Sequence, residues 1–219
     1  MWAEGDIISC VPYHSGAVHE IEMPAGRDLI VGRPGIIGQI TRCVFSDEIR
    51  MLEGLLNDQH TKERDLQRFF EQHPSFLRGL NYKNIYPQLV LQRDDGSQLK
   101  PDFILEPFEG GWCDILDIKL PKQKIIVGRG DRKALASGIH EVVAQLREYA
   151  AYFEERKHRT YVQEKYGLRV YKPRLVALVG RDLAQMSSPQ LRRAMTHYEN
   201  CQILTFDDLI THSKNRLLI

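Results

Sequence analysis

The sequence predicts a mixed α/β fold in which a central sheet of four to five strands is flanked by helices, with a small β-rich appendage at the N-terminus. Its 219 residues are 42% apolar and 27% charged, which is typical of a globular chain large enough to bury a core. Helical and strand-like periodicities alternate from Ser46 onward, whereas short apolar runs broken by Gly and Pro precede it. We therefore expect an appendage over residues 1–45 and a main domain over residues 46–219.

The appendage contains one glycine-rich stretch, Gly32–Gly38. Its glycines fall every third residue and no Lys-Ser or Lys-Thr follows, unlike the loops that hold nucleotide phosphates. These glycines are therefore expected in turns, and no nucleotide cofactor is expected.

The first half of the main domain reads as two short helices followed by a meander. Apolar residues recur at helical spacing from Ser46 to the breaker at Pro74, with a polar junction near residues 57–61. Asp-Gly and Gly-Gly turns then separate three strand-like segments, which should pair with one another. These segments are residues 85–91, 101–105 and 112–120.

The second half alternates helices and strands. Apolar residues three and four apart predict one long amphipathic helix over residues 131–155. A linker is then expected before the last four elements. They are a strand at 174–179, a helix at 189–198, a strand at 202–205 and a terminal helix from Asp207.

Charged residues interrupt two of the apolar strands of the meander. Because side chains alternate along a strand, Asp117 and Lys119 share one face, and Asp102 lies on the neighbouring strand. Two close carboxylates repel unless a cation lies between them, and oxygen ligands of this kind suit Mg²⁺. This pattern is typical of metal-assisted phosphodiester hydrolysis, but it is also typical of a surface ion pair on an ordinary edge strand.

Further segments favour the first interpretation. Pro101-Asp102 followed by Asp117-Ile118-Lys119 resembles the signature of the PD-(D/E)xK nuclease superfamily, and the chain from about Lys62 is similar to the nuclease domain of Shedu-type anti-phage defence proteins. The segments that carry this resemblance are residues 63–74, 101–103, 117–121, 145–149, 178–181 and 203–209.

The resemblance implies a restriction-endonuclease-like core and a role for each matching residue. Asp102 and Asp117 would bind Mg²⁺ or Mn²⁺, the backbone carbonyl of Ile118 could add a ligand, and Lys119 would be the catalytic lysine. Asp117 stands where Glu is frequent in the family, which shortens the reach of the carboxylate by one methylene.

Two helical residues complete the set that the resemblance implies. Glu63 occupies the first-helix acidic position that often completes such a site, although a solvated Glu is equally expected near a helix N-terminus. Gln145 stands in a Gln-x-x-x-Tyr pattern with Tyr149, whose ring is as well explained by core packing.

Local charge predicts contact with DNA, and the resemblance implies that the partner is double-stranded DNA, which could have free ends. Residues 119–133 carry six Lys and Arg against one acidic residue, and residues 156–174 carry seven against Glu164. Such clusters neutralise phosphates, although they could also be solvated loops, because the formal net charge is only +1. The candidate DNA-binding residues are Lys122, Lys124, Arg129, Arg132, Lys133, Arg156, Lys157 and Arg159.

The sequence also predicts the location of the protein in the cell. Four dispersed cysteines, no signal-like start and no long apolar run predict a cytoplasmic protein without a membrane partner. The resemblance implies a homo-oligomer that is restrained until phage or an altered DNA end is sensed, with the appendage in sensing or assembly. Two alternatives stay open: a non-catalytic DNA-binding or assembly module that keeps the nuclease fold, and a repair or restriction nuclease of the same superfamily.

Overall fold

The computed structural model describes residues 19–21, 30–32, 34–128, 133–181 and 200–216. The chain divides into two compact units, Met1–Gly54 and Leu55–Ile219. The expected boundary between residues 45 and 46 stays a prediction. A helix runs through this point without a break.

In the first unit, strands β1 (His19–Ile21) and β2 (Ile30–Gly32) pair antiparallel. Helix α1 (Pro34–Asn57) then starts well before Ser46, so the expected turn glycines of Gly35 and Gly38 lie inside a helix and that expectation is wrong. Proline is favoured in the first turn of a helix, where an N–H group would have no helical partner. Pro34 was therefore a signal for a helix start, but the two glycines that follow it favoured the prediction of turns.

The second unit begins with two helices on one face of the sheet. Thr61, in the polar junction, donates its hydroxyl hydrogen to the Leu55 carbonyl, and α2 (Glu63–Gln72) follows. Helix α3 (Ser75–Arg78) starts directly after Pro74, as the breaker predicts. Both helices bury aromatic side chains under the sheet, namely Phe69, Phe70 and Phe76.

The five-stranded sheet has the order β11-β10-β7-β6-β3 and is mixed, which confirms the predicted fold class. β3, β6 and β7 form the antiparallel meander, while β10 and β11 run parallel to β7. The bounds are β3 (Tyr82–Pro87), β6 (Phe103–Pro107), β7 (Asp114–Ile118), β10 (Leu175–Leu178) and β11 (Cys201–Leu204).

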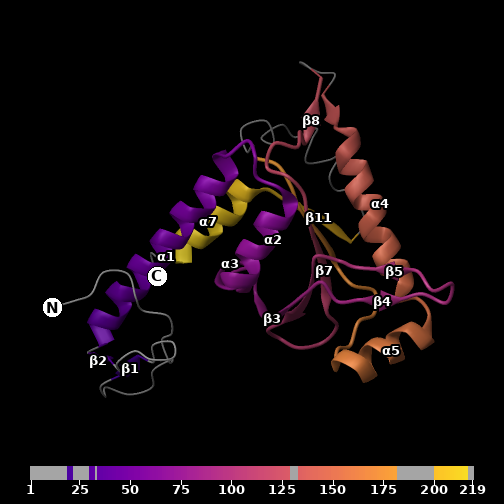
Figure 1. Ribbon diagram of the computed structural model, residues 1–219, viewed down its shortest axis with the longest axis horizontal. Helices are drawn as coiled ribbons and strands as arrows, with labels where there is room; N and C mark the ends of the chain where they lie inside the picture. Colours follow the sequence, from indigo (N-terminus) through magenta and orange to yellow (C-terminus); the bar gives the residue numbers. More distant parts are fainter. Residues whose placement is uncertain (1–18, 22–29, 33, 129–132, 182–199, 217–219) are drawn as a thin grey trace. The chain divides into compact units, whose positions relative to one another are not determined.

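Strand β7 is central and buried along its whole length. Helix α4 (Ser137–Tyr152) covers one face of β7 and β10, and α2 lies on the other side (Figure 1). The apolar stripe of α4, including Ile139, Val142 and Leu146, packs against Ile115 and Ala177 of the sheet. The terminal helix α7 (Phe206–Arg216) begins next to the predicted Asp207. The predicted helix at residues 189–198 lies outside the described residues.

Three smaller elements differ from the sequence prediction. Hairpin β4 (Leu91–Gln92) and β5 (Gln98–Leu99) splits the expected meander, and β8 (Ile126–Val127) pairs with β9 (Ala134–Leu135) before α4. The expected linker is in fact helix α5 (Arg156–Tyr166), which ends at the left-handed Gly167. Only Val162 of α5 is fully buried, so its apolar signal was too weak to be recognised.

Candidate active site

The two predicted carboxylates lie opposite each other at one end of the β6–β7 pair. Phe103 of β6 pairs with Leu116 of β7, so extending the register by one position places Asp102 opposite Asp117. Opposed residues of an antiparallel pair present their side chains on the same face. The sheet therefore brings together two acidic groups that are distant in sequence.

Asp102 is tied to the end of β7. Its Oδ2 accepts a hydrogen bond of 2.7 Å from the backbone N–H of Ile118. Burial, and then the neighbouring Asp117 carboxylate, raise the pKa of Asp102 from 3.8 to about 7, and the Ile118 and Lys119 interactions offset this only in part. The carboxyl group is thus poised between its two protonation states at neutral pH.

Asp117 is almost fully buried, with 3% of its side chain exposed. Its Oδ2 forms a 2.7 Å ion pair with Nζ of Lys119, and within the described part of the chain no other group donates a hydrogen bond to this buried oxygen. Burial raises the pKa of Asp117, while Lys119 opposes that shift. An additional cation would stabilise the ionised carboxylate.

Lys119 is held by the helix that covers the sheet. Its Nζ donates a 2.9 Å hydrogen bond to Oε1 of Gln145, and Nε2 of Gln145 donates a 2.7 Å bond to the hydroxyl of Tyr149. Burial alone would lower the pKa of Lys119, but the surrounding carboxylates, Asp117 first, outweigh burial and raise it. The ammonium therefore keeps its charge at neutral pH.

Glu63 extends the acidic character of the site from the first turn of α2. Its side chain is exposed, and its charge adds to the raised pKa of Asp102 and of Asp117, after the larger effect of burial at each. Glu63 therefore lies near both carboxylates. This position is compatible with a residue that completes the site and also with a solvated Glu at a helix N-terminus. Its role as a ligand stays a prediction, as does that of the Ile118 carbonyl.

This set of residues fits a divalent cation. Its side-chain donors are carboxylate oxygens, which hard cations such as Mg²⁺ and Mn²⁺ prefer. One of these oxygens is buried with only the Lys119 ammonium as a partner in the described chain, and the two carboxylates repel each other when both are ionised. Asp102 and Asp117 would hold the ion, and the charge of Glu63 adds to the negative potential around them.

The second carboxylate of β7, Asp114, has a structural role instead. Asp114 accepts hydrogen bonds from the Tyr82 hydroxyl and from the backbone and side chain of Arg174. It lies at the opposite end of the strand from Asp117, and its donors satisfy both of its oxygens. Asp114 therefore joins three strands and leaves no oxygen free of hydrogen bonds.

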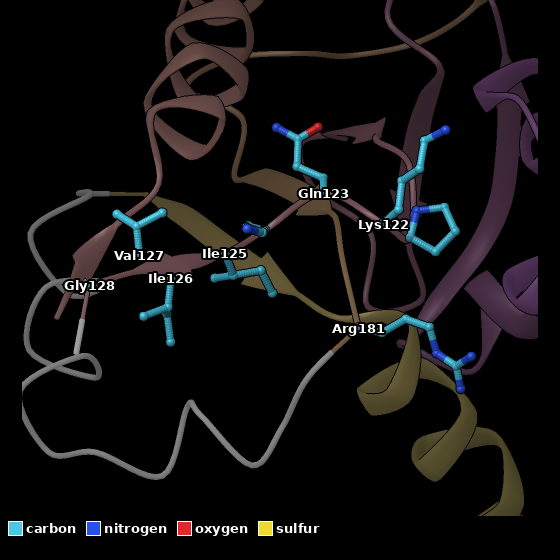
Figure 2. Close-up of a pocket in the computed structure, with 9 residues that line it drawn as sticks. Lys122, Gln123, Ile125, Ile126, Val127, Gly128 and Arg181 are labelled. Carbon is cyan, nitrogen blue, oxygen red and sulfur yellow. The ribbon is translucent and has the colours of Figure 1, made fainter. Parts of the chain in front are cut away.

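Two of the predicted DNA-binding lysines line a groove that begins directly after Lys119. Lys122 and Lys124 are exposed there, together with Arg181, around a volume of about 600 Å³. Figure 2 shows Lys122, Gln123 and Arg181 around this groove, with Ile126 and Val127 pointing to opposite sides of β8. Arg181, which the sequence reasoning missed, is held by Asp207 of α7 at 3.1 Å.

A glycine fixes the wall of this groove. Gly180 has a φ of +66°, and a Cβ there would lie 2.7 Å from the backbone oxygen of Gln123. Only glycine allows the segment after Lys119 to approach the end of β10 so closely. The basic segment is thereby held beside the carboxylate site.

The other candidate DNA contacts are distributed differently. Lys133 is partly buried next to β9, and Arg129 and Arg132 lie outside the described residues. Arg159 donates to the carbonyls of Phe153 and Glu154, where it caps the end of α4, and Lys157 pairs with Asp94 and Glu155. The structure thus brings Lys122 and Lys124, but not the α5 residues, into the groove that follows Lys119.

Tyr149 is a core residue that also contacts Gln145, so both interpretations of its sequence position fit the structure. Its ring is buried, and its hydroxyl accepts from Gln145 and faces the carbonyl oxygen of Lys100 at 3.4 Å. Tyr149 lies four residues after Gln145 in the sequence. On a helix this spacing places the two side chains next to each other, which is the sequence signal for their contact.

We expect Tyr149→Phe to lower the rate of any reaction at this site by about tenfold, because Gln145 can then rotate and present its NH₂ group to Lys119. The fold should lose only about 1 kcal/mol, the net contribution of one hydrogen bond. Tyr152→Phe is the matched control, because its hydroxyl donates to the Gln92 carbonyl and, within the described residues, has no hydrogen bond to Gln145 or Lys119. Equal effects of the two substitutions on rate would contradict the positioning role.

Comparison with known protein families gives a match over most of the chain. A family model described as "Shedu protein SduA, C-terminal" matches residues 60–210, which contain every residue of the site. No curated protein matches the chain. Among the described residues, no helix is both long enough and apolar enough to cross a membrane.

Proposed function

Because the chain belongs to the Shedu protein SduA C-terminal family, we propose that it is a metal-dependent DNA endonuclease of anti-phage defence. Membership of the family supports the defence role and the resemblance to a Shedu-type nuclease domain. The observation that carries the catalytic part is the convergence of Asp102, Asp117 and Lys119 at one end of the β6–β7 pair.

Each residue has a task that follows from its environment. Asp102 and Asp117 would hold the ion through their oxygen atoms, and Lys119 presents a positive charge beside them. When bound, Mg²⁺ or Mn²⁺ would polarise a phosphate oxygen and lower the pKa of a coordinated water. Lys119 stays protonated because its pKa is raised, so it stabilises developing negative charge and does not act as a base.

The groove after Lys119 supports double-stranded DNA as the substrate. Lys122 and Lys124 are exposed there and carry no ion pair that would neutralise them within the described residues. A phosphate backbone that follows this groove would approach the carboxylates from the Lys119 side. The family resemblance also supports homo-oligomeric assembly of the active protein.

The pKa of Asp102 makes metal binding dependent on pH. Its value of about 7 in the folded chain lies above the ordinary 3.8, so this carboxyl favours folding fully at low pH, and its contribution is lost as the pH rises through 7. Cation binding needs the ionised form and should strengthen over the same range. We expect affinity for Mg²⁺ to be about tenfold weaker at about pH 6 than at about pH 8.

Calorimetric titration of Mg²⁺ into the protein at the two pH values measures this effect. Asp102→Asn should remove both the binding and its pH dependence, while Asp58→Asn, at an exposed residue before α2, should change neither. Affinity that is constant across this range would contradict the assignment of Asp102.

The proposed activity is tested with DNA directly. Supercoiled plasmid incubated with the protein and Mg²⁺ should become nicked and then linear, which an enzyme restricted to DNA ends cannot achieve. Binding of DNA with no cleavage in Mg²⁺ or Mn²⁺ would instead favour the non-catalytic module.

A further inference from the structure

A second group of metal-ligating side chains lies outside the candidate active site. It combines Asp94, in the turn of the β4–β5 hairpin, with Glu155 and His158 at the start of α5. One ligand atom from each of the three lies within 4.8 Å of the others. Figure 1 shows the hairpin beside α5, and the two elements are in contact.

His158 is oriented as a metal ligand would be. Its Nδ1 lies 2.9 Å from the carbonyl oxygen of Tyr152, and because a carbonyl only accepts, Nδ1 must carry the proton. In the neutral ring, Nε2 therefore has the free lone pair. The imidazole also stacks on the Tyr152 ring, with centroids 4.1 Å apart and planes within 3°. A hydrogen bond from the second ring nitrogen to a carbonyl is the usual support of a ligating histidine.

The free nitrogen of His158 is buried and faces the acidic residues. The side chain is 12% exposed, and Nε2 has no hydrogen-bond partner within the described part of the chain. It lies 3.6 Å from Oδ1 of Asp94, which is too long for a hydrogen bond. Two ligands of a tetrahedral Zn²⁺ ion are separated by about 3.4 Å, so the spacing suits a shared ion.

We propose that Asp94, Glu155 and His158 form a second cation site, of the Zn²⁺ class, that fastens the β4–β5 hairpin to α5. A mixed nitrogen and oxygen donor set favours Zn²⁺ over Mg²⁺, which prefers oxygen ligands alone. Three protein ligands leave a fourth position for water. The three residues border a hollow of about 420 Å³, which leaves room for that water.

The ammonium of Lys157 lies between the two carboxylates that would bind the cation. It pairs with Asp94 and lies 3.0 Å from a carboxylate oxygen of Glu155. The side chain is 55% exposed, so it can turn into solvent when an ion binds. The other cation at the hollow, Arg93, is paired with Glu148 and does not neutralise Asp94 or Glu155. The metal and Lys157 therefore compete for the same carboxylates.

Because of this competition, substitutions of the neighbouring residues Lys157 and His158 should change the affinity for Zn²⁺ in opposite directions. Calorimetric titration of Zn²⁺ into the full chain should show His158→Ala weakening one binding event by about tenfold or more, the loss that even outer partners of a metal site cause. Lys157→Ala should strengthen the same event by at least about two- to fivefold, because an exposed ion pair no longer has to be broken. His60→Ala, at an exposed histidine elsewhere, is the control and should change nothing.

The active-site carboxylates are common to all of these variants, so the differences report the second site alone. If His158→Ala fails to fold, Asp94→Asn in the exposed turn replaces it and should also weaken binding. Equal Zn²⁺ affinity and stoichiometry in wild type and Asp94→Asn would overturn the proposal. So would Lys157→Ala binding no more tightly than wild type.

Discussion

Lys119→Met should lower the rate of DNA cleavage by at least about 10²–10³-fold, the loss that follows removal of one preorganised group stabilising transition-state charge. Methionine keeps much of the length of the side chain and removes its charge. Asp117 can then take up a proton, since its pKa is already raised, so the fold should survive. The measurement is the initial rate of plasmid cleavage, with circular dichroism to verify folding.

A matched lysine separates this effect from a general loss of positive charge. Lys83 is exposed on β3, outside the site and its groove, and Lys83→Met should leave the rate within about twofold of wild type. Comparable activity of Lys119→Met and Lys83→Met would show that Lys119 does not take part in the reaction.

The two buried aspartates of β7 should differ in their effects on stability and activity when they are substituted. Asp114→Ala should reduce the free energy of unfolding by about 2–4 kcal/mol, because the buried Tyr82 hydroxyl and the Arg174 backbone N–H lose their acceptor. Asp117→Asn should leave stability within about 1 kcal/mol of wild type, since it removes a carboxylate whose burial is unfavourable. Only the second substitution should abolish cleavage by a folded protein.

Urea unfolding measures both stabilities, and the cleavage assay measures activity on the same preparations. A strongly destabilised Asp117→Asn would mean that Asp117 is a structural residue like Asp114. A fully stable Asp114→Ala would contradict the role of Asp114 in joining β3, β7 and the start of β10.

The sheet could be predicted because its strands carry strong apolar signals and short turns. The meander of β3, β6 and β7, the following helix α4 and the parallel strand β10 all appear in the predicted order. The predicted bounds were less accurate: α4 begins at Ser137 and not at residue 131, because Ala134 and Leu135 form β9, and β3 starts three residues before the predicted strand. Elements with little apolar surface were missed. Helix α5 buries one residue completely, and the strands of the β4–β5 hairpin are two residues long.

In the site, too, residues related by local strand periodicity could be predicted, and contacts that depend on tertiary packing could not. Asp117 and Lys119 are neighbours on one strand, and the meander explains why Asp102 lies opposite, so the strand period was sufficient for these three residues. The contact between Lys119 and Gln145 depended on how α4 packs, and only the family resemblance indicated it. The approach of Asp94 to His158 joins a turn to a helix start that were not recognised as packed elements. No sequence pattern connects those two residues.

The central claim is that Asp102 and Asp117 form a metal-dependent centre that cuts DNA. The most direct test is a time course of plasmid cleavage by wild type and by Asp117→Asn, each with Mg²⁺ and each with a chelator in place of the metal. We predict cutting by wild type with Mg²⁺ and by none of the other three samples. Equal cutting by a folded Asp117→Asn, or by wild type with the chelator, would contradict the account.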